Sequence, residues 1–270
     1  MKGLTSLIFL MIITFNSLCS QVNKGDSPFY EQMRILPFQQ REELIVREVL
    51  SGDIPEYMRG FVEIRFKSTD AFGEGHKVTI FVKPDYITIG QDKSSFIIPM
   101  SPAAAQKIAD SLNCSLPTPK LVDIIYSHSK LKVEPFNFIP RGDRNETPDI
   151  LYDHSRVIFA QIKASGCNPG VFIAGSKKDI VITTALEDSL RRRHNVTIYG
   201  WHRLDGTPIQ PVHNKHLVTY VDYSHGVRLV SNKILIDGKE YDYRDILKDN
   251  VYHVLLSNEE KPFKITSYSY

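Results

Sequence analysis

The chain has 270 residues, enough for one large domain or two small ones, and either can bury a full hydrophobic core. Hydrophobic residues make up 42% and charged residues 24%, as in ordinary soluble globular proteins. The formal net charge of +2 is too small to indicate nucleic acid as a partner, and we expect none. We interpret the one basic run, residues 191–194, as a helix C-terminus that complements the helix dipole; a polyanion site is the alternative.

The N-terminus has the pattern of a secretory signal peptide. Lys2 supplies a positive charge, and residues 4–15 form an apolar stretch too short to span a bilayer comfortably. We predict a signal peptide at residues 1–20 and a mature chain that begins at Gln21, secreted or periplasmic. An uncleaved anchor is the alternative. No later segment approaches about 20 continuous apolar residues, so we expect no transmembrane span after cleavage.

Export changes how the cysteines are interpreted. With Cys19 removed, Cys114 and Cys167 remain, and an oxidising compartment permits a disulfide between them. Two separate buried thiols are an equally good interpretation. A third, Cys167 as a nucleophile, has only His154 nearby in the sequence as a base.

The first part of the mature chain combines a helix with a β-hairpin. Apolar residues at one-face spacing indicate the helix, alternating residues indicate the strands, and a glycine-rich segment indicates the turn between them. We predict a loop at 21–40, a helix at 41–50, strands at 61–66 and 77–82 joined by a turn at 73–75, and a short strand at 86–89.

Two further helices are predicted from their starting residues. Ser101-Pro102 and Thr118-Pro119 each place a hydroxyl at the N-cap and proline at the first helical position. A polar, proline-containing loop follows at 135–148, which is the best position for a boundary within the chain, and a third helix is expected at 152–164.

The second half is rich in short apolar runs separated by turn residues. Asp205-Gly206 and Asp237-Gly238 are typical of hairpin turns. We predict strands at 171–174, 180–184, 196–201, 217–220, 227–230 and 233–236, a turn at 208–211, and a last helix at 242–247. The pattern predicts an α+β fold in one domain, residues 21–270, with helices mainly in the first half, an antiparallel β-rich second half, and a sub-boundary near 135–148.

The best candidate for chemistry is the segment that contains Asp222, Ser224 and His225. In an extended strand, Asp222 and Ser224 point away from His225, so a Ser-His dyad of these neighbours is poor. Gly226 permits a bend that brings the imidazole back toward Asp222. His225 then becomes a general base oriented by Asp222. The alternative is a turn in which Asp222 and Ser224 bond local backbone amides.

A second candidate group surrounds the only tryptophan in the chain. An aromatic plane beside charged and amide side chains suits a sugar or peptide ligand, through stacking and hydrogen bonds. The predicted substrate-binding residues are Trp201, His202, Arg203, Asp205, Gln210, Tyr223 and Arg228. The alternative for Trp201 is a core residue at the start of a hairpin.

Metal binding is a weaker prediction. A catalytic zinc ion needs three protein ligands and a water molecule, and His216, Asp222 and His225 could supply them. The family of zinc D,D-peptidases has six residues between its first histidine and its aspartate, whereas five separate His216 from Asp222. The downstream Glu-x-Trp-His of that family is absent. We therefore predict no cofactor, with zinc as the alternative.

Two resemblances bear on function. The segment 224–229, SHGVRL, resembles the Ser-His-Gly-Cys-x-Arg-Leu segment of L,D-transpeptidases, but the nucleophilic cysteine is missing. The wider pattern PDYITIG, LPTPKLVD, GSKKDIVIT, YGWHRLDGTPIQP and YVDYSHGVRLV resembles a family of exported bacterial proteins of unknown activity. The first resemblance implies peptidoglycan chemistry that has been lost or replaced; the second implies export.

Together these observations lead to one functional hypothesis and one rival. The hypothesis is an exported hydrolase-like enzyme that acts on a cell-envelope or extracellular glycan or peptide, with His225 as base and Asp222 as its orienting group. The rival is a non-catalytic exported protein that binds glycan or peptide in the same cleft.

Overall fold

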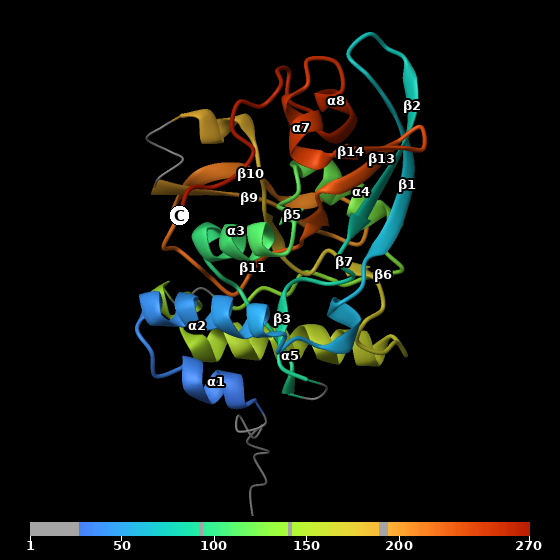
Figure 1. The fold of residues 1–270 in the computed structure, drawn as a ribbon. Coiled ribbons are helices and arrows are strands. Elements are labelled where there is room, and N and C mark those ends of the chain that lie inside the picture. The colour runs from blue at the N-terminus through green and yellow to red at the C-terminus, as the bar shows by residue number, and fades with distance from the viewer. Residues whose placement is uncertain (1–26, 92–93, 140–141, 189–193) are drawn as a thin grey trace, which may run out of the picture.

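The computed structural model describes residues 27–91, 94–139, 142–188 and 194–270. The predicted signal peptide and residues 191–193 of the basic run therefore lie outside the described residues. The α+β prediction is confirmed, with helices α2–α5 mostly in the first part of the chain and antiparallel sheets later. Helices α1, α2 and α5 lie together beneath the sheets, and α7 and α8 lie at the opposite end (Figure 1).

The helices begin where local capping chemistry permits. Ser101 and Thr118 each accept a hydrogen bond from a backbone amide three residues on, as predicted. Ser27-Pro28 has the same hydroxyl-proline pattern and starts a helix inside the segment predicted as loop, so that prediction is wrong. In the part of the chain that the structure describes, the α-helices are α1 (Pro28–Met33), α2 (Phe38–Ser51), α3 (Pro102–Ser111), α4 (Pro119–His128), α5 (Pro148–Ala164), α7 (Tyr243–Lys248) and α8 (His253–Leu256). Short 3-10 helices within the described residues are η2 (Glu56–Met58), η4 (Gly142–Glu146) and η5 (Thr184–Glu187).

A six-stranded sheet contains the predicted hairpin of the first half. β1 (Val62–Thr69) pairs with β2 (Gly75–Val82) in antiparallel register, with Ile64 opposite Ile80. The order of the other strands in this sheet is β14 (Lys239–Asp242), β13 (Lys233–Ile236), β2, β12 (Val230–Ser231), β5 (Cys114–Ser115), and β1 pairs with β2 outside this order. The predicted Asp237-Gly238 turn joins β13 to β14, and Asp242 caps α7. Two separate two-stranded sheets pair β3 (Thr88–Ile89) with β4 (Phe96–Ile97), and β6 (Leu131–Lys132) with β7 (Ile173–Ala174).

A four-stranded sheet holds the residues singled out as candidates. Its order is β10 (Pro208–Leu217), β9 (Asn195–His202), β8 (Lys178–Ile180), β11 (His225–Gly226). The prediction of a turn at 208–211 is wrong, because those residues begin β10. The prolines are tolerated because β10 is an edge strand, where a missing N–H breaks no ladder. The strands predicted at 180–184 and 217–220 are also wrong: β8 ends at Ile180, and β10 ends at Leu217.

The hydrophobic core contains side chains from both ends of the described chain. One cluster of buried side chains extends from Phe29 to Tyr268 and includes residues of both larger sheets. Cys114 and Cys167 are free thiols, the first buried and the second partly exposed, so the disulfide interpretation is not the one seen. Among the described residues, no helix is both long and apolar enough to cross a bilayer.

Candidate functional site

Asp222 is the centre of a hydrogen-bonded turn. Its Oδ1 accepts bonds from the Ser224 backbone N at 2.8 Å and the Ser224 Oγ at 2.5 Å, and its Oδ2 accepts one from the Tyr220 hydroxyl at 3.0 Å. The Nε2 of His225 lies 3.9 Å from Oδ1, beyond hydrogen-bond distance. The side chains of Asp222 and Ser224 therefore hold the bend, as in the second of the two sequence interpretations.

His225 is buried next to this turn without a hydrogen-bond partner. Its exposed fraction is 1%, and neither ring nitrogen has a partner. Burial lowers the pKa of His225 to about 4, so the imidazole is neutral at pH 7. Burying a polar group without a partner costs about 1–3 kcal/mol. A histidine in this position is consistent with a ligand-binding site.

The carboxyl group of Asp222 is ionised at neutral pH. Burial raises its pKa, but the nearby imidazole of His225, the ammonium group of Lys178 and the Ser224 hydrogen bonds together lower it far below the usual range. Because His225 is uncharged at pH 7, the charge of Lys178 and the hydrogen bonds are the stabilising contacts under that condition.

A row of aromatic rings links His225 to the surface. The ring of Tyr220 lies 5.7 Å from His225 and stacks on His216 at 4.4 Å, and His216 lies 4.7 Å from His213. His216 and Tyr220 are the aromatic residues of a surface hollow of about 360 Å³, which is lined by Glu146, Lys215, His216, Leu217, Thr219 and Tyr220. Asp222 accepts the bond from the Tyr220 hydroxyl and His225 contacts the Tyr220 ring, but neither residue lines the hollow.

Trp201 has a backbone conformation that is rare for a bulky residue. Its φ is +57°, and the preceding Gly200 has φ +104°. Such strain costs about 1–3 kcal/mol and is frequently found at binding sites. The indole ring lies 4.9 Å from the Lys178 ammonium nitrogen and 6.4 Å from the Tyr223 ring. The indole N–H is buried and has no hydrogen-bond acceptor.

Two lysines that were not among the predicted site residues, Lys177 and Lys178, precede and begin β8. Lys177 is fully buried, and its Nζ donates to the Tyr223 carbonyl at 2.6 Å and lies 3.1 Å from Nδ1 of His154. Burial lowers the pKa of Lys177 to about 7. In the sequence these lysines fall between the strands predicted at 171–174 and 180–184, and no local signal distinguishes a buried lysine from an exposed one.

Gly226 is required for the close packing behind this site. β11 runs parallel to β8, with His225 opposite Lys178 and Gly226 opposite Asp179. A Cβ atom on Gly226 would lie 2.6 Å from Cβ of Lys177 and 2.7 Å from Cδ1 of Tyr86. The glycine thus permits the approach of β11 that places His225 beside Lys178.

Several of the predicted binding residues lie elsewhere. His202 is buried against α4, with its Nε2 2.9 Å from Oδ1 of Asp123 and its ring stacked on Tyr126. Arg203 and Asp205 are exposed at the hairpin turn, where the Asp205 carboxylate accepts a bond from the Thr207 amide. These side chains do not join the group around Trp201.

Gln210 and Arg228 also have other partners. The Gln210 amide donates to the carbonyl of Pro211. Arg228 is buried and donates to the carbonyls of Lys83 and Ile173, each at 2.8 Å, so it links segments of the core. The predicted residues that the structure brings together are therefore Asp222, Tyr223, Ser224, His225 and Trp201.

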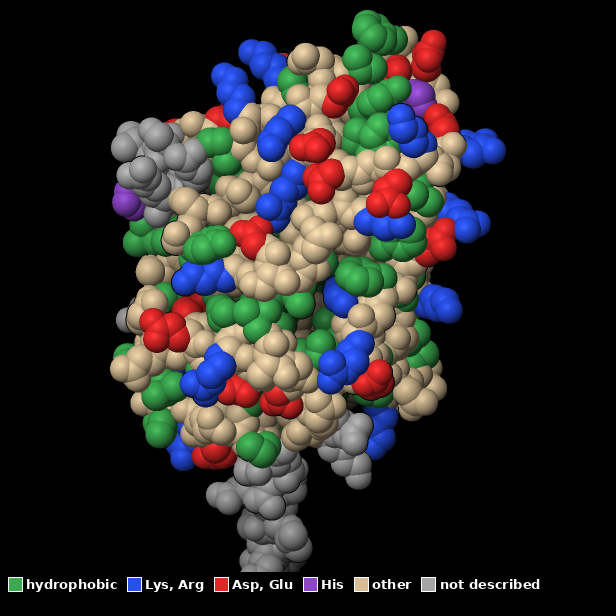
Figure 2. All heavy atoms as spheres, viewed as in Figure 1, with side chains coloured by type: hydrophobic (Ala, Val, Ile, Leu, Met, Phe, Trp, Pro, Cys, Tyr) green, Lys and Arg blue, Asp and Glu red, His purple; other side chains and the backbone are tan. Residues whose placement is uncertain are grey.

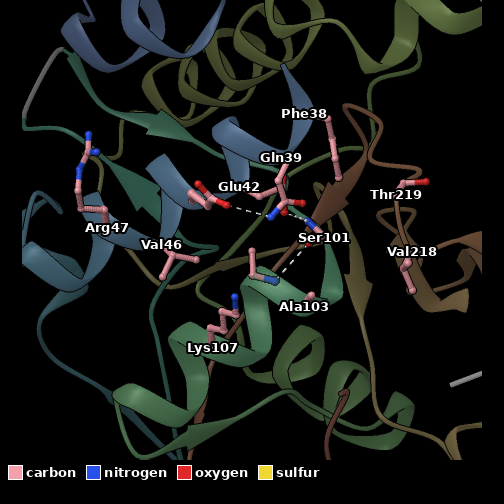
Figure 3. A pocket seen from close by; sticks show the side chains of 12 residues that line it. Phe38, Gln39, Glu42, Val46, Arg47, Ser101, Ala103, Lys107, Val218 and Thr219 are labelled. Carbon is pink, nitrogen blue, oxygen red and sulfur yellow. Dashed lines mark hydrogen bonds between the residues drawn. The ribbon is translucent and has the colours of Figure 1, made fainter. Parts of the chain in front are cut away.

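A second hollow adjoins the first. It has a volume of about 340 Å³ between α2 and α3, where Figure 3 shows Glu42 bonded to Ser101. Hydrophobic side chains gather on this face between the two helices (Figure 2). Thr219 lines both hollows. The turn at 217–220 thus separates two adjacent depressions.

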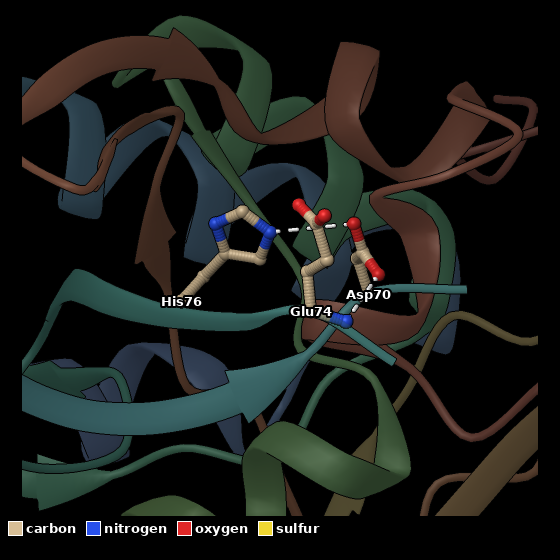
Figure 4. A group of neighbouring side chains, drawn as sticks. All are labelled: Asp70, Glu74 and His76. Carbon is tan, nitrogen blue, oxygen red and sulfur yellow. Dashed lines mark hydrogen bonds and ion pairs between the residues drawn. The ribbon is translucent and has the colours of Figure 1, made fainter. Parts of the chain in front are cut away.

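Among the described residues, one group of three potential metal ligands has its atoms within 4.8 Å of one another: Asp70, Glu74 and His76 (Figure 4). Asp70 accepts bonds from the amides of Phe72 and Glu74, and His76 lies between the carboxylates of Asp70 and Asp237. These contacts give the group a structural role, because they join the β1–β2 hairpin to the β13–β14 hairpin. The set His216, Asp222 and His225 is not such a group, because the Tyr220 ring lies between the two histidines.

Comparisons of this sequence with protein-family models, with curated proteins and with solved structures give no match.

Proposed function

We propose that this chain is an exported protein, secreted or periplasmic, that binds a glycan or peptide of the cell envelope or its surroundings. One observation carries the proposal: the buried His225, without a hydrogen-bond partner, contacts the ring of Tyr220, which lines a surface hollow together with His216. A neutral imidazole in that position offers one donor and one acceptor to a ligand that displaces the Tyr220 ring.

The contacts of Asp222 favour binding over catalysis. Its oxygens accept bonds from Ser224 and Tyr220, and the carboxylate lies too far from His225 to orient the imidazole. The hydroxyl of Ser224 donates to Asp222 and is buried. These residues act as the frame of a binding site.

The pair of hollows favours an extended ligand. Because Thr219 lines both, a chain-like molecule could cover the turn at 217–220 and contact α2 and α3 beyond it. The aromatic rings in one hollow and the apolar lining of the other suit sugar rings or peptide side chains.

Thermal unfolding with and without ligand tests the proposal. We expect soluble peptidoglycan fragments, polysaccharides or short peptides to raise the Tm of the wild type, since a ligand at 100 times its Kd adds about 2.7 kcal/mol of stability. His216→Ala should abolish the shift. His128→Ala, at an exposed histidine that ends α4, is the matched control and should retain it. The proposal fails if no ligand of these classes raises Tm, or if His216→Ala responds like the wild type.

The second candidate function is a hydrolase. The observation that favours it is the imidazole of His225, which at pH 7 is in the unprotonated form that a general base requires. Product release from the same ligands, present in the wild type and absent in a folded His225→Ala variant, would favour hydrolysis over binding alone.

A further inference from the structure

We propose that Lys178, Trp201 and His225 form a subsite for the carboxylate group of the ligand, an inference that rests on the proposed binding function. The anion comes from one of two sources, the C-terminus of a peptide or the acid group of a sugar acid. Both present the same two acceptor oxygens to the protein.

The three side chains are brought together by the sheet. Lys178 and His225 are direct partners in the parallel pairing of β8 with β11, so their side chains extend from the same face. Gly200 is the partner of Lys178 on the other side. The positive φ values of Gly200 and Trp201 redirect the strand, and the indole ring lies beneath the Lys178 ammonium group.

All three side chains carry nitrogen atoms that lack an acceptor. The indole N–H of Trp201 and both ring nitrogens of His225 are buried without partners, and these side chains are 5% and 1% exposed. For the Lys178 ammonium group, the structure gives no acceptor among the residues that it describes, only the indole ring. Because His225 is neutral at pH 7, one of its ring nitrogens carries a proton and donates. A ligand group rich in acceptors therefore matches three donors: the indole N–H, this imidazole N–H and the Lys178 ammonium group.

Asp222 does not fill that role. Its oxygens already accept bonds from Ser224 and Tyr220, and although its charge opposes the lowering of the Lys178 pKa by burial, the two side chains form no ion pair. Lys178 is partly exposed, whereas Trp201 and His225 are buried. A carboxylate would therefore approach from the side of Lys178 and meet the other two groups behind it.

The fluorescence of Trp201, the only tryptophan in the chain, measures this binding directly. The full chain is titrated with N-acetylalanine and its amide, and with methyl glucuronoside and methyl glucoside. We expect a saturable change of emission with one of the two acids and at least a tenfold weaker response to its uncharged analogue. The acid that binds identifies the source of the carboxylate.

Three variants test whether binding requires the positive charge of Lys178. Lys178→Met should weaken binding of the acid at least tenfold, and Lys178→Arg should keep it within a few-fold. Lys239→Met removes another lysine that lies over an aromatic ring, that of Tyr241, and should bind like the wild type. Far-UV circular dichroism and Tm confirm that each variant is folded.

The outcomes distinguish this inference from the proposed function. If acid and uncharged analogue bind equally, or if Lys178→Met binds like the wild type, the carboxylate subsite is refuted while ligand binding stands. A response to orthophosphate but to neither acid also refutes it. If no probe changes Trp201 emission while glycans or peptides raise Tm, ligands bind elsewhere and the subsite is again refuted.

Discussion

The ammonium nitrogen of Lys178 lies 4.9 Å from the centre of the Trp201 ring, and Trp201 is held at a positive φ that few non-glycine residues adopt. The strained strand and the cation over the indole ring together define the environment of the only tryptophan in the chain. This arrangement makes the candidate site accessible to simple spectroscopy.

We expect the emission of Trp201 to be shielded from solvent in the native protein. The side chain is buried between Lys178 and Tyr223, so acrylamide should quench it weakly, and unfolding in urea should raise the quenching several-fold. The same chain in urea is the internal control. Native quenching as strong as that of the unfolded chain would contradict the burial of Trp201.

Gly226→Ala should destabilise the protein by about 3 kcal/mol. The added methyl group would overlap Lys177 and Tyr86, and overpacking of a filled core typically costs about 1–3 kcal/mol or more. Gly60→Ala is the matched control, because a Cβ there meets nothing within 4 Å. Urea unfolding of both variants measures the difference. Equal midpoints would show that β11 does not pack against β8 as described.

Lys177→Met should flatten the dependence of stability on pH between pH 7 and 9. The pKa of Lys177 is lowered by burial from 10.5 to about 7 in the folded chain. In this range the unfolded chain holds the proton and the folded chain does not, so stability rises with pH by up to about 1.4 kcal/mol per pH unit. Urea unfolding at pH 7, 8 and 9 tests this. Lys215→Met, at an exposed lysine, is the control and should keep the wild-type change of stability with pH. If Lys177→Met also keeps that change, Lys177 stays protonated in the folded chain.

Asp222→Asn should reduce stability at pH 7 by about 2 kcal/mol, because hydrogen bonds to a buried charged group contribute about 1.5–3 kcal/mol. The pKa of Asp222 is lowered in the folded chain, so its contribution is complete above the unfolded pKa of about 3.9 and is lost as the pH falls below it.

Urea unfolding at pH 7, 5 and 3 should therefore show a constant gap between wild type and Asp222→Asn down to pH 5, and a smaller one at pH 3. Asp205→Asn, at an exposed turn carboxylate, should leave stability nearly unchanged. A gap that widens toward low pH would contradict the described environment of Asp222.

Local chemistry was sufficient to predict many elements from the sequence. Ser101 and Thr118 start helices because a hydroxyl cap and a following proline act within one helical turn. The Asp237-Gly238 hairpin forms for a similar reason, since its two residues adopt positive φ values that the turn requires. Such signals depend on neighbours a few residues away, and the sequence contains them in full.

The tertiary structure alone decided which polar residues meet. Lys178 and His225 are 47 positions apart in the numbering and become partners only when β11 pairs with β8. His202, next to Trp201 in the sequence, points instead to Asp123 on α4. Burial and strand pairing depend on contacts between distant segments, and those contacts determine which charges lose water and which donors lack partners.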